Sequence, residues 1–289
     1  MDNKDFVILK TLYEEKNITH TAKKLFMTQP ALSDRLKRLE NEFGCTLFIR
    51  QSRGIIFTSE GELLYKYCLR SLTDYEKTKN LLLSNTSVPK GVLTIGCSNV
   101  FAKYRMPKIL SEFKKLYPDI EINMRSGYST ERYKDFLEGN IHICIARGDH
   151  NWTEQKQMLW EEPLCLLTSQ DINFTDLPTL PYIHYKTDSI LQGVLDDWWY
   201  AHFQKPPRTT IEVDAMDTAL KLVQNHLGYT LLSQSCAQDT PTIKTIPLYM
   251  PIGTPLMRKT WIYYRNNYIH FKTIKAFVNF IIQHECSSP

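Results

Sequence analysis

The segment between residues 28 and 53 gathers side chains that can hold or read a nucleic acid. Gln29 can form a bidentate hydrogen-bonded pair with adenine, Ser33 can bond to either kind of base, and the cations suit phosphates or guanine. The candidate DNA-binding residues are Thr28, Gln29, Pro30, Ser33, Arg35, Lys37, Arg38, Arg50 and Arg53. Any one of them alone is more often part of a solvated helix face. Together they predict a surface that binds double-stranded DNA.

A second set of polar residues follows strands that the rest of the sequence predicts. Ligands of open α/β sheets bind beyond the carboxyl ends of the strands, where helix N-termini favour anions. The candidate effector-binding residues are Cys97, Ser98, Asn99, Tyr128, Ser129, Arg147, Thr230 and Arg258. Most arginines form surface salt bridges instead, but a guanidinium at a strand end can grip a carboxylate with two hydrogen bonds. Two arginines in one cleft should repel each other until an anion enters, so we expect a small carboxylate effector whose entry closes the cleft.

Motifs for catalysis, cofactors and metals do not occur in the sequence. It contains no GxGxxG, GxxxxGK[ST], HExxH or GxSxG pattern. Cys97, with a base such as His142 or His184, is a candidate nucleophile. His142, however, alternates with apolar residues, which indicates a position in a sheet. The pairs Asp196-Asp197 and Glu161-Glu162 are typical of solvated faces rather than of catalytic pairs. We therefore expect a protein that is not an enzyme, with no cofactor and no metal.

The DNA-binding candidates fall on a predicted helix, turn and helix. Helices are expected over residues 5–15 and, with Thr19 as N-cap, over 19–26. A sharp turn then leads to Pro30, the first residue of a helix over 30–42. The second helix of such a pair enters the major groove. Residues 47–58, with Gly54 at the centre, predict a two-stranded ribbon.

A long helix without proline is predicted over residues 60–83. Every third or fourth position follows the spacing of a coiled-coil seam. The seam residues are Tyr65, Cys68, Leu72, Tyr75, Lys79 and Leu82. The helix either packs on its own domain or, as we expect, pairs with a second copy through Tyr65, Cys68, Leu72, Tyr75 and Leu82.

After Gly91 strands alternate with helices. Strands over 92–95, 120–124 and 141–146 enclose helices over 104–117 and 130–137, which is the order of a parallel sheet. A second set is predicted as strands at 164–167, 209–213, 229–232 and 261–264 and helices at 188–203, 216–226 and 271–284. The second half is therefore expected to form two α/β lobes.

Length, charge and cysteines limit the class of protein. The 289 residues, 43% of them hydrophobic, suit roughly two domains with a buried core. Residues 1–90 carry 15 Lys and Arg against 11 Asp and Glu, whereas residues 91–289 carry 20 of each, so the excess charge of +4 lies in the first third. The seven scattered cysteines indicate reduced thiols rather than disulfides or a zinc site. With no signal peptide pattern and no apolar run of about 18 residues, we expect a cytoplasmic protein without membrane contact.

The N-terminal signature resembles that of LysR-type transcriptional regulators. The matching residues are Thr21 to Ser33, Leu39-Glu40, Gly44, Leu47 to Arg50 and Thr58 to Gly61. The family usually has Ala in place of Thr21 and a small residue or Gly in place of Lys16. Gly228 to Leu232 also resembles the glycine-led strand of the family's second lobe, with Ser233 where a proline commonly follows.

The resemblance implies a domain plan. It consists of an N-terminal all-α winged helix-turn-helix domain (1–58), a linker and dimerisation helix (59–85), a hinge (86–90) and an α/β two-lobe effector-binding domain like periplasmic binding proteins (91–289). Lobe I would comprise residues 91–161 and 266–289, and lobe II residues 162–265.

The resemblance also implies partners. Such regulators bind promoter or operator DNA as homodimers or homotetramers and respond to a small effector, and their role brings RNA polymerase into consideration. The order of motifs around residues 96–98, 146–148 and 255–258 is similar to a citrate-responsive branch, so citrate or another carboxylate is the expected effector. The alternatives are a solute-binding protein or enzyme on the same scaffold, and a helical adaptor that binds protein through the seam.

Overall fold

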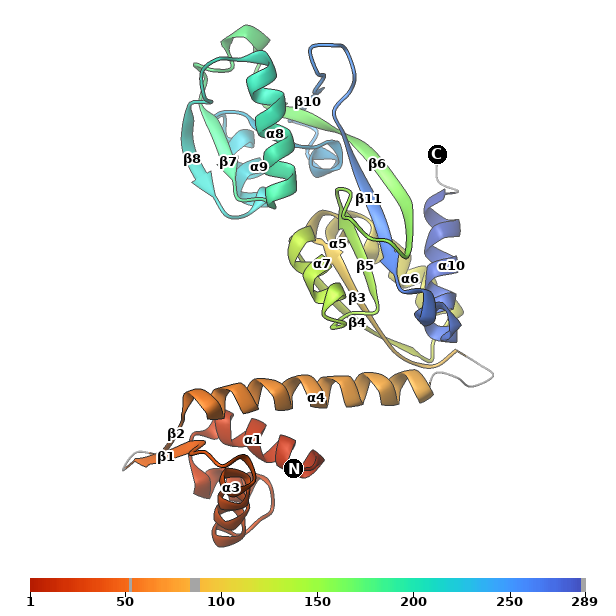
Figure 1. The fold of residues 1–289 in the computed structure, drawn as a ribbon. Helices are drawn as coiled ribbons and strands as arrows, with labels where there is room; N and C mark the ends of the chain where they lie inside the picture. The colour runs from red at the N-terminus through yellow and green to blue at the C-terminus, as the bar shows by residue number, and fades with distance from the viewer. Residues whose placement is uncertain (52–53, 84–88, 287–289) are drawn as a thin grey trace. The chain divides into compact units, whose positions relative to one another are not determined.

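The computed structural model describes residues 1–51, 54–83 and 89–286 (Figure 1). The chain divides into two compact units, Met1–Leu83 and Ser84–Pro289. Arg53, the side chain of Leu82 and residues 86–88 of the expected hinge lie outside the described residues. In the part of the chain described here, no helix combines the length and the apolar character of a membrane span.

The first unit is a winged helix-turn-helix, as predicted. Its elements are α1 (Asn3–Glu15), α2 (Ile18–Lys24), α3 (Gln29–Phe43), β1 (Phe48–Gln51), β2 (Gly54–Phe57) and α4 (Ser59–Leu83). Leu9 and Leu12 of α1 and Leu32, Leu36 and Leu39 of α3 are buried in one core, because their spacing places them on one face of each helix. Asn17, not the predicted Thr19, caps α2, since its side chain accepts the N–H of His20 at 3.0 Å.

Lys16 ends α1 in a backbone conformation that suits glycine. Its φ is 49°, in the left-handed region that costs a residue with a Cβ atom about 1 to 2 kcal/mol. The Lys16 carbonyl accepts the N–H of Ile55 at 2.9 Å and thereby holds the ribbon β1–β2. Gly54 is needed at this contact, because a Cβ atom there would lie 2.3 Å from the same carbonyl oxygen. The departure from the family pattern at Lys16 therefore falls on a strained turn.

We predict that Lys16→Gly raises the free energy of unfolding of the first unit by about 1 kcal/mol, because it relieves the left-handed strain. The matched control is Lys10→Gly, an exposed position inside α1, which should lower the same free energy by about 1 kcal/mol. Urea unfolding followed by circular dichroism measures both. A Lys16→Gly protein no more stable than the parent would contradict the strain.

Lobe I of the second unit is a mixed sheet with helices packed on it. Its elements are β3 (Gly91–Ser98), α5 (Asn99–Tyr104), α6 (Met106–Leu116), β4 (Ile120–Gly127), α7 (Ser129–Leu137), β5 (Ile143–Arg147), η3 (Asn266–His270) and α10 (Lys272–Cys286), with parts of β6 (Gln155–Thr168) and β11 (Met257–Tyr264). The strand order is β6-β11-β5-β3-β4. As predicted, β3 pairs in parallel with both β4 and β5, and this places their carboxyl ends at one edge of the sheet.

Lobe II contains the second half of β6. Its other elements are η1 (Phe174–Asp176), β7 (Tyr182–Tyr185), α8 (Ser189–His202), β8 (Thr209–Val213), α9 (Met216–Gln224), β9 (Thr230–Ser233), η2 (Gln234–Ala237) and β10 (Lys244–Pro247). Leu164 to Thr168 of β6 lie between β9 and β10, while β7 and β8 form a parallel pair. The lobe has its own core around Trp198, Trp199 and Tyr229.

The two lobes share strands, and this changes the predicted lobe boundaries. β6 and β11 run side by side from one lobe to the other (Figure 1), paired antiparallel from Gln155↔Tyr264 to Pro163↔Met257. β11 also pairs with β5 over Thr260 to Tyr264, so residues 260–264 belong to lobe I and not to lobe II as predicted. Three strand segments were not predicted from the sequence: β7, β10 and the first half of β6.

Candidate functional site

The DNA-binding candidates on α3 lie at its N-terminal end. Thr28 caps the helix, with its hydroxyl 3.4 Å from the N–H of Ala31, and Thr28, Gln29 and Pro30 are exposed. Ser33 is half-buried, whereas Lys37, Arg38 and, on β1, Arg50 are exposed. The helix thus presents neutral hydrogen-bonding groups at its start and cations further along.

Arg35 does not belong to this surface. Its Nε donates to Asp5 at 2.5 Å and one terminal nitrogen donates to both carboxylate oxygens of Asp2 at 2.7 Å. Asp2 and Asp5 also form the capping box of α1. Arg35 therefore fastens α3 to the start of α1, and its assignment to DNA binding is corrected to a packing role.

The first half of the predicted seam is used within the chain. Cys68 is completely buried in the core of the first unit, and this burial raises the pKa of its thiol to about 11. Tyr65 stacks on Tyr13 of α1 with ring centroids 3.8 Å apart. Both are thereby corrected from dimer contacts to core contacts, because α4 packs on α1 over its first turns. Leu72 is half-buried and Tyr75 is exposed.

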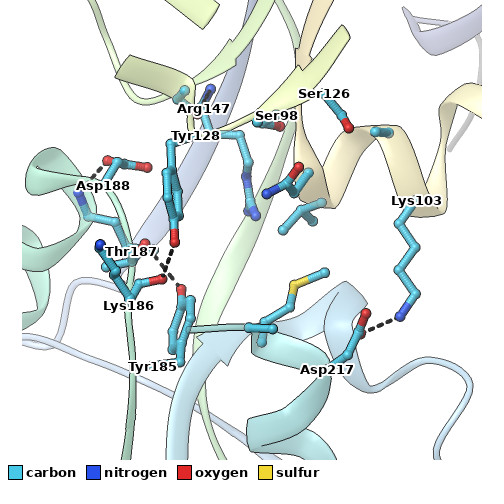
Figure 2. Close-up of a pocket in the computed structure, with 18 of the residues that line it drawn as sticks. Ser98, Lys103, Ser126, Tyr128, Arg147, Tyr185, Lys186, Thr187, Asp188 and Asp217 are labelled. Carbon is cyan, nitrogen blue, oxygen red and sulfur yellow. Dashed lines mark hydrogen bonds and ion pairs between the residues drawn. The ribbon is translucent and has the colours of Figure 1, made fainter. Parts of the chain in front are cut away.

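A cleft of about 490 Å³ lies between the lobes of the second unit. Figure 2 shows side chains from both lobes around it, with Tyr128 and Arg147 on one side and Tyr185, Lys186 and Asp217 on the other. The predicted residues that line the cleft are Ser98, Asn99, Tyr128, Ser129, Arg147 and Arg258. Sequence reasoning missed the lobe II wall, which comprises Tyr185 to Asp188, Leu191 and Asp214 to Asp217. The predicted residues at the strand ends thus line one cavity together with residues of lobe II.

Two predicted residues lie elsewhere. Cys97 is completely buried and does not line the cleft, and its burial raises the pKa of the thiol to about 12, which also removes it as a nucleophile at neutral pH. Thr230 is buried and donates its hydroxyl to the carbonyl of Ile183 at 2.8 Å. Successive residues of a strand face opposite sides, so each strand end contributes only every other side chain to the cleft.

Arg147 is already neutralised by the protein. A terminal guanidinium nitrogen lies 2.5 Å from Glu162 and 2.6 Å from the hydroxyl of Ser233, and both charged side chains are 5% exposed. Glu162 also accepts the backbone N–H and the hydroxyl of Ser235. Arg147 is therefore not the bare cation that the predicted repulsion assumed. Ser233, where the family commonly has proline, supplies one of the hydrogen bonds that hold Arg147.

Arg258 has its own carboxylate partner. It donates to Asp188 at 3.1 Å and to the carbonyl of Arg147 at 3.3 Å. Burial lowers the pKa of Arg258, Asp188 opposes this shift, and the charge of Arg147 adds to it. Asp188 also caps α8 through the N–H of Leu191. The Nε atoms of both arginines are buried without a hydrogen-bond partner among the described residues.

Two helices direct uncapped N-termini at the cleft. α7 of lobe I begins after Tyr128 and α9 of lobe II begins after Ala215, and neither N-cap residue offers a side-chain hydrogen bond. The residues at both starts line the cleft. Unsatisfied N–H groups and the helix dipole favour a negative charge at such ends. The cleft is thus bordered by the uncapped start of one helix from each lobe.

A winged helix-turn-helix joined to a two-lobe unit with a polar cleft defines a DNA-binding transcriptional regulator with an effector-binding half. Residues 4–62 match the family model for the bacterial regulatory helix-turn-helix protein, lysR family, and residues 86–285 match the LysR substrate binding domain. The chain therefore belongs to the LysR family of transcriptional regulators. This membership favours a regulator over the solute-binding protein, the enzyme and the helical adaptor.

Relatives match almost the whole chain. The uncharacterized HTH-type transcriptional regulator YraN of Bacillus subtilis (strain 168) is 37% identical over 281 residues, which cover 97% of each chain. YkuM, from the same strain and also uncharacterized, is 28% identical over 286 residues, with 97% of each chain covered. These names do not point to a citrate-responsive branch.

Solved structures share the fold. Full-length CbnR complexed with its target DNA has a TM-score of 0.74 at 18% identity, over 97% of this chain and 99% of that chain. Full-length BenM has a TM-score of 0.56 at 21% identity, over 99% and 97%. Among the residues described here no group of three or more His, Cys, Asp and Glu side chains is placed to hold a metal ion.

We predict that Arg147→Met lowers the free energy of unfolding of the second unit by about 3 to 5 kcal/mol, because it leaves Glu162 charged and buried. Adding Glu162→Gln should recover most of the loss, since the amide oxygen can still accept from Ser235. The control is Lys244→Met, whose ion pair with Asp171 is exposed on both sides and should be worth no more than about 1 kcal/mol. Urea unfolding is the measurement, and a loss below 1 kcal/mol for Arg147→Met would contradict the buried pair.

Proposed function

We propose that this regulator senses a small carboxylate anion in the cleft between its lobes. The observation that carries the proposal is the pair of uncapped helix N-termini, one from each lobe, at the same cavity. A ligand carboxylate can accept the free N–H groups of α7 and α9 without displacing any protein side chain. One anion, or the two ends of one dianion, would then touch both lobes.

The side-chain charges of the cleft balance one another, so the backbone amides decide whether an anion or a cation is favoured. Arg147 pairs with Glu162 and Arg258 with Asp188, and Lys103 forms an ion pair with Asp217. Of the other charged lining residues, Lys186 and Asp214 have no ion pair with each other in the described part of the chain. The helix N-termini add partial positive charge to this neutral background. An anion is favoured over a cation for that reason.

Ligand entry is proposed to change the angle between the lobes. Both buried ion pairs connect the two lobes, because Glu162 and β11 lie where the strands cross and Asp188 lies at the start of α8. A ligand that binds one angle more tightly shifts the population toward it. In an oligomer, that shift would alter how the recognition helices are spaced on DNA.

Calorimetry on the full chain tests the effector class. We expect citrate, another di- or tricarboxylate or a monocarboxylate to bind to the cleft. Neutral or cationic analogues of the carboxylate that binds should not bind to the cleft. Citrate is the first candidate, because two carboxylates can reach two helix N-termini.

We predict that Lys186→Gln lowers the affinity for the carboxylate that binds to the parent about three- to tenfold, because an exposed cation at the cleft is lost. Lys205→Gln, an exposed lobe II lysine outside the cleft, is the control and should bind as the parent does. The effector proposal fails if no carboxylate binds to the parent protein.

The start of α3 is proposed to read base edges while the cations hold phosphates. We predict that Gln29→Ala and Ser33→Ala relax base preference by about 1 to 3 kcal/mol per lost pair. Lys37→Ala should weaken binding to all sequences and reduce the salt slope by about 1. Selection from a random duplex library and salt titrations measure these effects. If Gln29→Ala keeps the base preference of the parent, Gln29 does not contact base edges. Arg38, Arg50 and Arg53 are proposed to contact phosphates.

The second half of the α4 seam is proposed to join two copies. Leu72 and Tyr75 are not used by the core of the first unit, and Leu82 continues their spacing. A homodimer or homotetramer would bury this apolar surface and supply two recognition helices to an operator, where RNA polymerase is the expected further partner.

A further inference from the structure

A second cavity lies wholly within lobe II and shares no lining residue with the cleft. Its volume is about 360 Å³. β7, α8 and β8 supply most of its wall, and Leu231 of β9 completes it. The residues that line it are Tyr182, His184, Gln192, Leu195, Asp196, Trp199, Tyr200, Pro207, Thr209, Glu212 and Leu231. The proposed carboxylate site leaves this cavity unused.

The charges of this cavity have one sign. Asp196 and Glu212 line it, and none of its lining residues is a lysine or an arginine. Gln192 donates to Asp196 at 2.8 Å and shares a hydrogen bond of 3.2 Å with His184. His184 in turn lies 3.7 Å from Glu212. Hydrogen bonds thus link His184 through Gln192 to Asp196, whereas Glu212 lies near His184 without a hydrogen bond. The two carboxylates disfavour an anionic guest.

Aromatic residues form the apolar part of the wall. Trp199 is buried, with its indole N–H donated to the carbonyl of Lys205 at 2.8 Å, while Tyr200 is exposed. Leu195 and Leu231 are buried as well. Aromatic faces attract organic cations, and apolar walls accept the body of such a guest.

Tyr182 offers a polar group to the cavity. Its side chain lines the cavity and the residue is 5% exposed, yet its hydroxyl has no hydrogen-bond partner among the described residues. Burial raises the pKa of Tyr182, so the phenol stays neutral and can donate or accept. The hydroxyl can therefore bond to a guest in the cavity, because no described side chain competes for it.

We propose that this cavity binds a primary ammonium with a compact apolar or aromatic body. The ammonium hydrogen bonds would go to the Asp196 and Glu212 carboxylates and to the Tyr182 oxygen, and the body would lie against Trp199 and Tyr200. A bare metal ion is a poorer match, because two carboxylates apart from each other offer too few ligands. The site would give the regulator a second input of opposite charge to the first.

Calorimetry on the full chain with phenethylamine as the probe tests the site. We expect saturable binding with a dissociation constant of about 1 mM or tighter, and none for the neutral isostere 2-phenylethanol. Asp196→Asn and Glu212→Gln should each lower the affinity for the amine roughly tenfold, since each removes a charged acceptor. Tyr182→Phe should weaken it about threefold.

The matched control is Asp197→Asn, the neighbouring exposed carboxylate of α8 that does not line the cavity, which should change binding less than twofold. Thermal unfolding of each variant confirms that the fold persists. The proposal is overturned if phenethylamine does not bind to the parent, or if Asp196→Asn and Asp197→Asn bind it alike. Lys186→Gln should leave amine binding unchanged, so this site and the carboxylate cleft can fail separately.

Discussion

Two buried ion pairs at the crossing of the lobes organise the regulatory half of this protein. Arg147 with Glu162 and Arg258 with Asp188 place four charges in the interior, where an unpaired charge is very costly. The cost is offset by two hydrogen bonds, one that Arg147 donates to the Ser233 hydroxyl and one that the Ser235 N–H donates to Glu162. The end of β5, the middle of β6 and the starts of β11 and α8 are thereby held to one another, and the cleft takes its shape from them.

This arrangement explains why the cleft relies on backbone amides rather than on bare arginines. Each guanidinium has a carboxylate of the protein beside it, so neither offers a full positive charge to a ligand. Neither α7 nor α9 has a side-chain hydrogen bond from its N-cap residue, and the carboxylates in their first turns, Glu131 and Asp217, are near the cations Arg132 and Lys103. A cleft built in this way remains stable without a ligand, and this suits the anion-sensing role proposed for it.

Local patterns in the sequence predicted most of the fold. The helix-turn-helix followed from apolar spacing, from Pro30 at the start of a helix and from Gly44 at its end, all signals that lie within a few residues of the element. The parallel strands of lobe I followed in the same way. The shared strands β6 and β11 did not, because their pairing joins residues about a hundred positions apart.

The candidate sites were predicted less well, because partner residues distant in sequence decide them. Arg35 resembled its cationic neighbours on α3 until the structure placed it against Asp2 and Asp5. Cys68 followed the seam spacing but faces the core. The start of α9 carries no motif, and only its position opposite α7 across the cleft identifies it.

The most direct test of the carboxylate cleft is the response of the amides at the two helix starts. The full chain, labelled with 15N-serine and 15N-methionine, is titrated with the carboxylate that binds tightest in calorimetry, and the signals of Ser129 and Met216 are assigned by substitution. The account predicts that both amide protons shift downfield and saturate with the same dissociation constant. Shifts confined to one lobe, or absent from both residues while the ligand binds, would contradict it.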